Sequence, residues 1–596
     1  MTQQTAPTIA SPGPFSIPSE LPASLNRLAG APRVLLTLAC LLLLVPFLSK
    51  PLHVDDPMYV WTAQQIKSRP FDPYGFAVNW QATMTPMASE MQNPPLVCYY
   101  LAGAMSILGA KDAALHLAML LPSLGVVLGT YQLAKELRVR PLLAAATTMA
   151  MPVFLLSAST VMSDVPMVCA YVWAIWFWIA GLRREKTGML WIATALVAVS
   201  ALTKYFGITL FPLLIVYALM HTRRPKIAWL LPLLLPAAIL TAYQLWTKHL
   251  YGHGLLFGAA NYATALRWTG HNASGGGISS RLLPILNGLS FTGACCCAAI
   301  GLAFPQLTRR EKVALIVTGA LMTGIIALAK PWAADGVASA FAGSDNRSSI
   351  LFAVQVGLWS ACGGGVLWLA ARSLWRQRDA DSALLACWIA GTFCFAVFVN
   401  WNVAGRSILP MAPAVAILAA RRWTRQPNET TTTDNDSPNP ALPWLPWAML
   451  APAVALALLV TAADTALART ARDAVMQICD NVAEDRRDHV FFSGHWGFQQ
   501  QMQAAGCRAF DKYTSNLDPG DVYVMPDNNN RAIALPAPAV HLATVLKLQP
   551  MRWLSTMRKE CGAGFYSDVW GPLPFAFGPV PAEHYTVNIV DVPLHH

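Results

Sequence analysis

Apolar blocks of about 16 to 22 residues recur along most of this chain, and this repetition limits its possible folds more than any other feature. A helix needs about 20 predominantly apolar residues to cross a bilayer. Only 12% of the residues are charged, against roughly 25% in soluble domains, because hydrocarbon excludes charge. The sequence therefore predicts an all-α polytopic membrane protein with about thirteen transmembrane helices. The predicted spans are residues 34–49, 113–134, 141–157, 165–182, 188–203, 205–220, 227–247, 284–305, 313–330, 350–371, 382–399, 406–420 and 443–463.

Clusters of Lys and Arg fall in alternate short loops between these spans. The clusters lie within residues 135–140, 183–186, 223–226, 309–312, 372–378 and 421–425. Because basic residues stay in cytoplasmic loops, these loops and the N-terminus are predicted to lie inside, and the C-terminal tail outside. The formal net charge of +11 then reflects topology, and no basic patch on a soluble domain indicates nucleic-acid binding.

Three regions follow from this pattern. Residues 1–33, rich in Pro, Ser and Thr, are predicted to be a disordered cytoplasmic tail. Residues 34–463 form the predicted transmembrane domain, and residues 464–596 a soluble domain outside the membrane.

The soluble tail has the pattern of a small α/β domain. His489–Ser493 and Asp521–Pro526 are strand-like, and the second follows a Pro519-Gly520 turn. Gln499–Ala505 is helix-like and ends at a glycine.

The apolar block Leu96–Gly109 is too short to cross a bilayer comfortably. We expect an interfacial or re-entrant helix in a first outer loop, residues 50–112. If the block crossed the membrane, every later basic loop would change sides. This assignment places Asp55 and Asp164 on the same side of the membrane.

Two adjacent carboxylates, Asp55 and Asp56, follow the first apolar block. Asp is a favoured helix N-cap and Pro is favoured at the first helical position, so Asp56 is expected to cap a short helix that Pro57 opens. Asp55 is left without a structural role, and we predict that it is catalytic, with Asp56 a weaker candidate.

Asp164 lies in Ser163-Asp164-Val165-Pro166, between two predicted spans. It could cap a helix, but an acid at the membrane edge is also a functional candidate by default. Lys204, Arg406 and Arg347 are predicted at the outer face. Each cation could extend its head group to the membrane surface, or bind a lipid phosphate through charge-assisted hydrogen bonds.

These motifs together resemble the membrane glycosyltransferases of the GT-C fold, in particular the bacterial aminoarabinose transferases and relatives of the protein O-mannosyltransferases. The resemblance covers about residues 34–420. The resembling segments, in chain order, are Asp55-Asp56-Pro57-Met58-Tyr59, Asn93-Pro94-Pro95-Leu96, Ser163-Asp164-Val165-Pro166, Leu202-Thr203-Lys204 and Arg406-Ser407-Ile408-Leu409-Pro410. The chain departs from the pattern at Asn93, where the family usually has Lys, and at Asp56, where it usually has Glu. Tyr59, Asn93 and Tyr99 join the substrate-binding candidates, although the Pro pair after Asn93 could equally be structural punctuation.

The resemblance implies an enzyme of a bacterial inner membrane that takes a sugar from a polyprenyl-phosphate donor. The acceptor would be a lipid, a glycan or a protein outside the cytoplasm, and the reaction a single inverting displacement. Asp55 would be the general base, Asp164 would orient the acceptor or hold a metal, and Lys204 and Arg406 would stabilise the departing phosphate. No cofactor is certain; a divalent metal ion is an open alternative.

Two other functions fit parts of the pattern. A polymerase or ligase of polyprenyl-linked oligosaccharides would also handle such donors, but typically through Arg-rich outer loops. A transporter of lipid-linked sugars is less compatible, because transporters often carry internal repeats and this sequence has no evident one.

Overall fold

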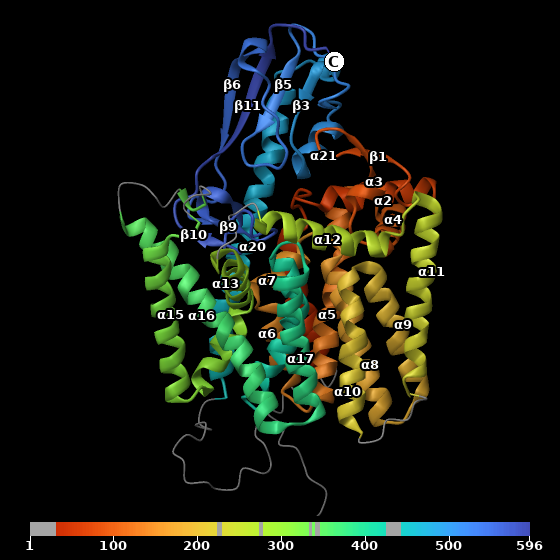
Figure 1. Ribbon diagram of the computed structural model, residues 1–596, viewed down its shortest axis with the longest axis vertical. Coiled ribbons are helices and arrows are strands. Elements are labelled where there is room, and N and C mark those ends of the chain that lie inside the picture. The colour runs from red at the N-terminus through yellow and green to blue at the C-terminus, as the bar shows by residue number, and fades with distance from the viewer. Residues whose placement is uncertain are drawn as a thin grey trace, which may run out of the picture.

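The computed structural model describes residues 31–222, 229–272, 278–332, 337–339, 346–424 and 443–595, with the backbone alone at 31, 267–272, 278–281 and 346–348. Figure 1 shows long helices packed side by side as a bundle, with a β-containing domain at one end. Nearly all of the predicted N-terminal tail lies outside the described residues, as does the basic cluster at 223–226.

Six described helices are long and apolar enough to cross a membrane. They are α5 (Asp112–Glu136), α8 (Asp164–Arg183), α15 (Arg309–Ala329), α16 (Asn346–Gln377), α17 (Ala380–Cys394) with its π-helical extension η8 (Phe395–Val399), and α20 (Leu445–Asp480). Two bent helix pairs raise the number to eight if each pair is one span. A mostly helical, multi-pass membrane architecture is thus supported, while the count of thirteen stays a prediction.

The first bent pair joins α6 (Pro141–Met149) to α7 (Pro152–Ala158) at 65°. Pro152 opens α7, and because Pro has no N–H to donate, the helix of α6 cannot continue through it. The second pair joins α13 (Ile278–Cys295) to α14 (Cys297–Ala303), with a bend of 68° between Leu282–Cys295 and Cys297–Gln306. The chain after the first bent pair leads into Asp164, one of the predicted site residues, which begins α8.

Shorter helices complete the bundle. They are α1 (Ala31–Leu44), α9 (Thr187–Thr203), α10 (Leu210–His221), α11 (Leu234–Tyr251), α18 (Gly405–Ile408) and α19 (Ala412–Arg421). All six overlap predicted spans.

A layer of short elements covers the end of the bundle nearest the C-terminal domain (Figure 1). Its elements are α2 (Asp56–Ser68), β1 (Ala77–Asn79), β2 (Met84–Pro86), α3 (Met87–Glu90), α4 (Leu96–Leu108) and α12 (Leu255–Asn272). α4 is the apolar block expected in the first outer loop, and it packs against α2 and α5.

The C-terminal domain holds α21 (Trp496–Ala504) and a mixed five-stranded sheet in the order β4-β3-β5-β11-β6. The sheet strands are β3 (Val490–Phe492), β4 (Arg508–Ala509), β5 (Val522–Pro526), β6 (Val540–Leu548) and β11 (Glu583–Val590). β3 runs parallel to β4 and β5, and the other pairs are antiparallel. Shorter strands are β7 (Leu554–Ser555), β8 (Met557–Arg558), β9 (Ala563–Gly564) and β10 (Ala576–Phe577). The two predicted strands and the predicted helix are confirmed within a few residues.

The predicted domain boundary at residues 463 and 464 falls inside α20, which continues to Asp480. The apolar sequence ends near residue 463, but residues 464–480 contain neither Gly nor Pro. Because no helix-breaking residue follows, the helix continues beyond the apolar block. α20 therefore continues from the bundle into the C-terminal domain as one continuous element (Figure 1).

The C-terminal domain is packed into the same core as the bundle. Trp496, Phe565 and Tyr566 belong to one buried cluster with residues of the long helices. At Gly497 an added Cβ would lie 1.9 Å from the carbonyl oxygen of Leu52, so only glycine permits this close approach of α21 to the loop after α1.

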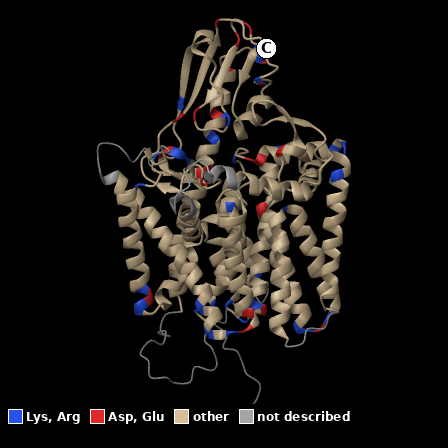
Figure 2. Cartoon of the chain, in the orientation of Figure 1, with Lys and Arg blue, Asp and Glu red and all other residues tan. Residues whose placement is uncertain are grey.

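Charge is distributed unevenly along the bundle. Figure 2 shows Lys and Arg gathered at the end opposite the C-terminal domain. Residues at this end include Arg183 at the last turn of α8 and Arg309 at the start of α15. The basic clusters that were predicted to share one side of the membrane thus lie together where the structure describes them.

Candidate active site

The segment that leads into α2 makes a tight turn. Val54 has φ of +48°, a left-handed conformation that a β-branched residue rarely adopts. Such strain persists only where surrounding contacts fix it, and it is concentrated at functional sites. The turn directs the two neighbouring carboxylates, Asp55 and Asp56, to different partners.

Asp56 is fully buried and holds the turn together. Its Oδ2 accepts a hydrogen bond from the His53 backbone N–H at 2.9 Å, and its Oδ1 accepts one from the Val161 N–H at 2.8 Å. Burial raises the pKa of Asp56 to about 7, although Lys50 and the two backbone donors oppose the shift.

The expectation that Asp56 caps α2 is wrong. Asp55 occupies the cap position, no side chain makes the capping bond, and Asp56 is the first residue of the helix. Backbone donors at His53 and Val161, outside α2, compete successfully for the Asp56 carboxylate. Asp56 therefore links the turn before α2 to the loop that contains Val161. The Asp55 carboxylate makes neither of these bonds and does not cap the helix.

Asp55 pairs with a cation that is 351 residues away in the sequence. Its Oδ2 lies 2.8 Å from Arg406 Nη1, with the Asp55 side chain 30% exposed and that of Arg406 16% exposed. The same Arg406 nitrogen contacts Met162 Sδ at 3.2 Å. Arg406 thus connects the first carboxylate to the chain just before Asp164.

Asp164 pairs with Lys204, the residue that follows α9. Its Oδ1 lies 2.5 Å from Lys204 Nζ, and its side chain is 1% exposed. Its Oδ2 is buried and has no hydrogen-bond partner among the described residues. Ser163, not Asp164, occupies the N-cap position of α8 and makes no side-chain capping bond, so Asp164 does not cap the helix.

Tyr59 links the two halves of the site. Its hydroxyl lies 3.0 Å from Ser163 Oγ, beside Asp164, and accepts a hydrogen bond from Asn93 Nδ2 at 3.1 Å. Asp55 and Asp164 both lie within electrostatic reach of Arg406 and of the Tyr59 hydroxyl. Six predicted residues are therefore brought together: Asp55, Tyr59, Asn93, Asp164, Lys204 and Arg406.

Two other predicted residues fall outside this group. The Tyr99 hydroxyl donates to the Pro70 carbonyl oxygen at 2.5 Å, within the outer loop. The side chain of Arg347 lies outside the described part of the chain.

The sequence did not reveal a buried ion pair next to the site. Lys50 Nζ lies 2.6 Å from Asp464 Oδ2, and both side chains have no exposed surface. The Tyr566 hydroxyl donates to the same Asp464 oxygen at 2.8 Å, and the Tyr566 ring lies 5.6 Å from the Arg406 guanidinium carbon. The available signal was Asp464 itself, an acid inside an apolar helix, which is a functional candidate by default.

The donor set does not suit a metal ion. Among residues with described positions, no group of three or more His, Cys, Asp and Glu could hold one. Asp55 and Asp164 each already face a cation, whereas Mg²⁺ and Ca²⁺ prefer several oxygen ligands.

The sequence model of one known protein family matches part of this chain. Residues 92–250 match the sequence model of the dolichyl-phosphate-mannose-protein mannosyltransferase family. The resemblance to GT-C membrane glycosyltransferases is confirmed. The matched segment contains Asn93, Asp164 and Lys204 of the candidate site, whereas Asp55 and Arg406 lie outside it. No curated protein matches this chain significantly.

Solved structures show more distant likenesses. An oligosaccharyltransferase from Archaeoglobus fulgidus, tethered to an acceptor peptide, is 13% identical with a TM-score of 0.44; the likeness covers 82% of this chain but only 64% of that one. ArnT from Cupriavidus metallidurans bound to undecaprenyl phosphate is 15% identical, with a TM-score of 0.37 and coverage of 83% and 93%. The mycobacterial arabinofuranosyltransferase AftD is 13% identical, with a TM-score of 0.34 and coverage of 94% and 40%.

Proposed function

We propose that this chain is an integral-membrane glycosyltransferase that moves a sugar from a polyprenyl-phosphate donor to an acceptor hydroxyl. The observation that supports it best is the paired arrangement of Asp55 with Arg406 and Asp164 with Lys204. It supplies carboxylates for proton transfer beside cations for a phosphate, at one end of an apolar bundle. The family match over residues 92–250 supports the same chemistry independently.

The proposed reaction is a single inverting displacement. The acceptor oxygen forms a bond to the anomeric carbon while the bond from that carbon to the phosphate oxygen breaks, and polyprenyl phosphate leaves with the bonding electrons. Asp55, the more exposed acid, takes the acceptor proton. General-base catalysis of this kind is typically worth about 10²- to 10⁴-fold in rate.

The remaining residues act by position and charge. Arg406 and Lys204 stabilise the negative charge that develops on the leaving phosphate. The unpartnered Oδ2 of Asp164 accepts a hydrogen bond from the acceptor and orients it. Asn93, in the place of the family's usual Lys, bonds to Tyr59, so the donor phosphate depends more heavily on the two remaining cations.

The reaction takes place on the side of the membrane that holds the C-terminal domain. The basic end of the bundle lies opposite, and basic loops remain in the cytoplasm (Figure 2). We infer a multi-pass protein of a bacterial inner membrane, with a lipid, glycan or protein acceptor outside the cytoplasm.

A transfer assay tests this proposal. The purified chain is incubated with radiolabelled polyprenyl-phosphate sugars and membrane extract, and the labelled product is identified. Asp55→Asn is expected to reduce label transfer by roughly 100-fold or more, because the general base is lost. The matched control is Glu484→Gln, an acid whose side chain is 90% exposed on the C-terminal domain.

Full activity of Asp55→Asn would contradict the assignment and favour a polymerase or ligase that does not need this acid. Movement of intact labelled donor across vesicles, without sugar transfer, would favour a transporter instead.

A further inference from the structure

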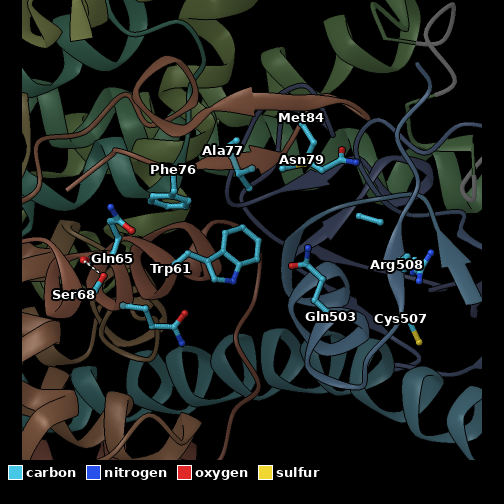
Figure 3. Close-up of a pocket in the computed structure, with 13 residues that line it drawn as sticks. Trp61, Gln65, Ser68, Phe76, Ala77, Asn79, Met84, Gln503, Cys507 and Arg508 are labelled. Carbon is cyan, nitrogen blue, oxygen red and sulfur yellow. Dashed lines mark hydrogen bonds between the residues drawn. The ribbon is translucent and has the colours of Figure 1, made fainter. Parts of the chain in front are cut away.

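A cleft of about 720 Å³ opens between the first outer loop and the C-terminal domain. One wall is α2 with the strand β1, and the other is formed by the end of α21 and by β4 (Figure 3). The Asp55–Arg406 and Asp164–Lys204 pairs do not line it. It is therefore distinct from the site described above.

Two aromatic rings form the face on the outer-loop side. Trp61 and Phe76 are each only partly buried and lie close together in Figure 3. Trp61 packs edge-on against Trp80, with ring centroids 6.2 Å apart and planes at 82°. Trp80 in turn stacks on His495 of the C-terminal domain at 5.1 Å. The partly exposed indole of Trp61 is thus held in place by its contact with Trp80.

Amide side chains surround these rings. Gln64 on α2 and Gln503 on α21 are exposed, and neither side chain makes a hydrogen bond within the described structure. Figure 3 shows Gln503 facing Trp61 from the opposite wall. Arg508 adds one cation, paired with Asp488 at 3.2 Å. The lining contains no carboxylate.

We propose that this cleft binds a carbohydrate chain. A pyranose ring has an apolar C–H face that packs on an aromatic ring, and a rim of hydroxyls that both donate and accept. Amide groups likewise donate and accept, so Gln64 and Gln503 match a neutral, polyhydroxylated ligand better than a charged one. Specific pockets combine apolar surface with a few placed polar groups in the same way.

The cleft serves as an accessory site and not as the place of reaction. With a rise of about 1.5 Å per residue, Gln64 lies roughly 12 Å along α2 from Asp56. Trp61 and Tyr59 are two residues apart, so their side chains leave the helix in nearly opposite directions. A glycan bound here would be held at a distance from its reacting group, where remote binding energy can support orientation.

Calorimetry with neutral oligosaccharides of hexose and N-acetylhexosamine tests the proposal. The full chain is placed in phospholipid nanodiscs, because detergents with sugar head groups would compete. Trp61→Ala is expected to weaken binding roughly tenfold through loss of the aromatic face. A second variant, Gln64→Ala with Gln503→Ala, changes only exposed side chains and should weaken binding without disturbing the fold. The control is Trp375→Ala, a tryptophan 72% exposed outside the cleft.

Binding of the oligosaccharides that is weakened by both cleft variants and unchanged in Trp375→Ala supports the site. Absence of oligosaccharide binding, equal binding by all variants, or binding of an unglycosylated peptide alone overturns it. The measurement does not involve the donor, and Asp55→Asn should bind oligosaccharide normally. Failure of the carbohydrate site is therefore distinguishable from failure of the proposed transferase activity.

Discussion

The Nζ of Lys50 lies 2.6 Å from Oδ2 of Asp464, across 414 residues of sequence, and neither side chain has any exposed surface. Asp464 also accepts hydrogen bonds from Thr556 and Tyr566 of the C-terminal domain. One carboxylate therefore joins the loop after α1, the helix α20 and the C-terminal domain. Because the Tyr566 ring also packs against the Arg406 guanidinium, this buried group contacts the candidate site.

Removal of one partner of this pair is expected to destabilise the protein strongly. Asp464→Leu leaves Lys50 as an uncompensated buried charge, which typically costs about 3–5 kcal/mol. The double variant Lys50→Met with Asp464→Leu should recover most of that loss, because no buried charge remains. Thermal unfolding of the purified variants measures both effects. Equal destabilisation of the single and double variants would show that the ion pair is not the main interaction.

Lys204 is expected to govern donor affinity more than Asp55 does. Lys204→Ala should raise the donor KM by roughly tenfold or more, because a charge-assisted hydrogen bond to the phosphate is lost. Asp55→Asn should lower kcat with little change in donor KM. The control is Lys248→Ala, an exposed lysine in the last turn of α11.

Steady-state kinetics with varied donor separates the two effects, and Lys204→Arg should restore part of the affinity. An unchanged donor KM in Lys204→Ala would remove Lys204 from the phosphate site. Because Asp164 loses its cation in Lys204→Ala, the unfolding temperature of this variant must be measured alongside its kinetics.

Local motifs were sufficient to predict much of the site, and long-range pairings were not. Asp55, Asp164 and Lys204 could be selected because each interrupts an apolar pattern beside a predicted span. The Lys50–Asp464 pair could not, since hydropathy and spacing carry no information about which distant charge is the partner. The role of Asp56 was missed for the same reason: its partner Val161 is 105 residues away. The end of α20 was also missed, because amphipathic sequence continues the helix beyond the apolar block.

Gly405 is expected to be intolerant of a side chain. An added Cβ would lie 2.4 Å from Cε2 of the buried Phe565 ring. The Gly405 N–H also donates a hydrogen bond to the Phe565 backbone oxygen at 2.7 Å. Gly405→Ala must shift either the ring or α18, and the shift would displace the adjacent Arg406. We expect a loss of about 1–3 kcal/mol in stability, typical of overpacking, together with reduced kcat.

Gly391→Ala is the matched control for this substitution. Gly391 lies within α17 and has no atom within 4 Å of an added Cβ, so Ala should be neutral or slightly stabilising there. Unfolding temperature and transfer rate are compared for the two variants. Similar behaviour of both would show that the contact with Phe565 does not position Arg406.

The contact between the outer loop and the C-terminal domain is expected to weaken in acid through His495. This ring stacks on Trp80, is 2% exposed, and lies 3.2 Å from Gln499 Oε1. The pKa of His495 is lowered to about 4, mainly by burial; the bond to Gln499 opposes this shift and the Arg531 charge adds to it. The unfolded chain binds the proton near pH 6.5, so below that pH it holds more protons than the folded chain.

Stability contributed by neutral His495 is therefore complete above pH 6.5 and is lost as the pH falls toward 4. Between pH 7.5 and pH 5 the loss should be about 2 kcal/mol, since each pH unit below 6.5 costs about 1.4 kcal/mol. Other titrating groups cancel when wild type is compared with His495→Gln, whose disadvantage should shrink by that amount at pH 5. Thr544→Ala, at an exposed and non-titrating position of the same domain, should run parallel to wild type at every pH. Parallel curves for His495→Gln as well would mean that this ring takes up its proton over the same pH range in the folded and unfolded chains, and in acid the stack on Trp80 would then have to accommodate a buried charge.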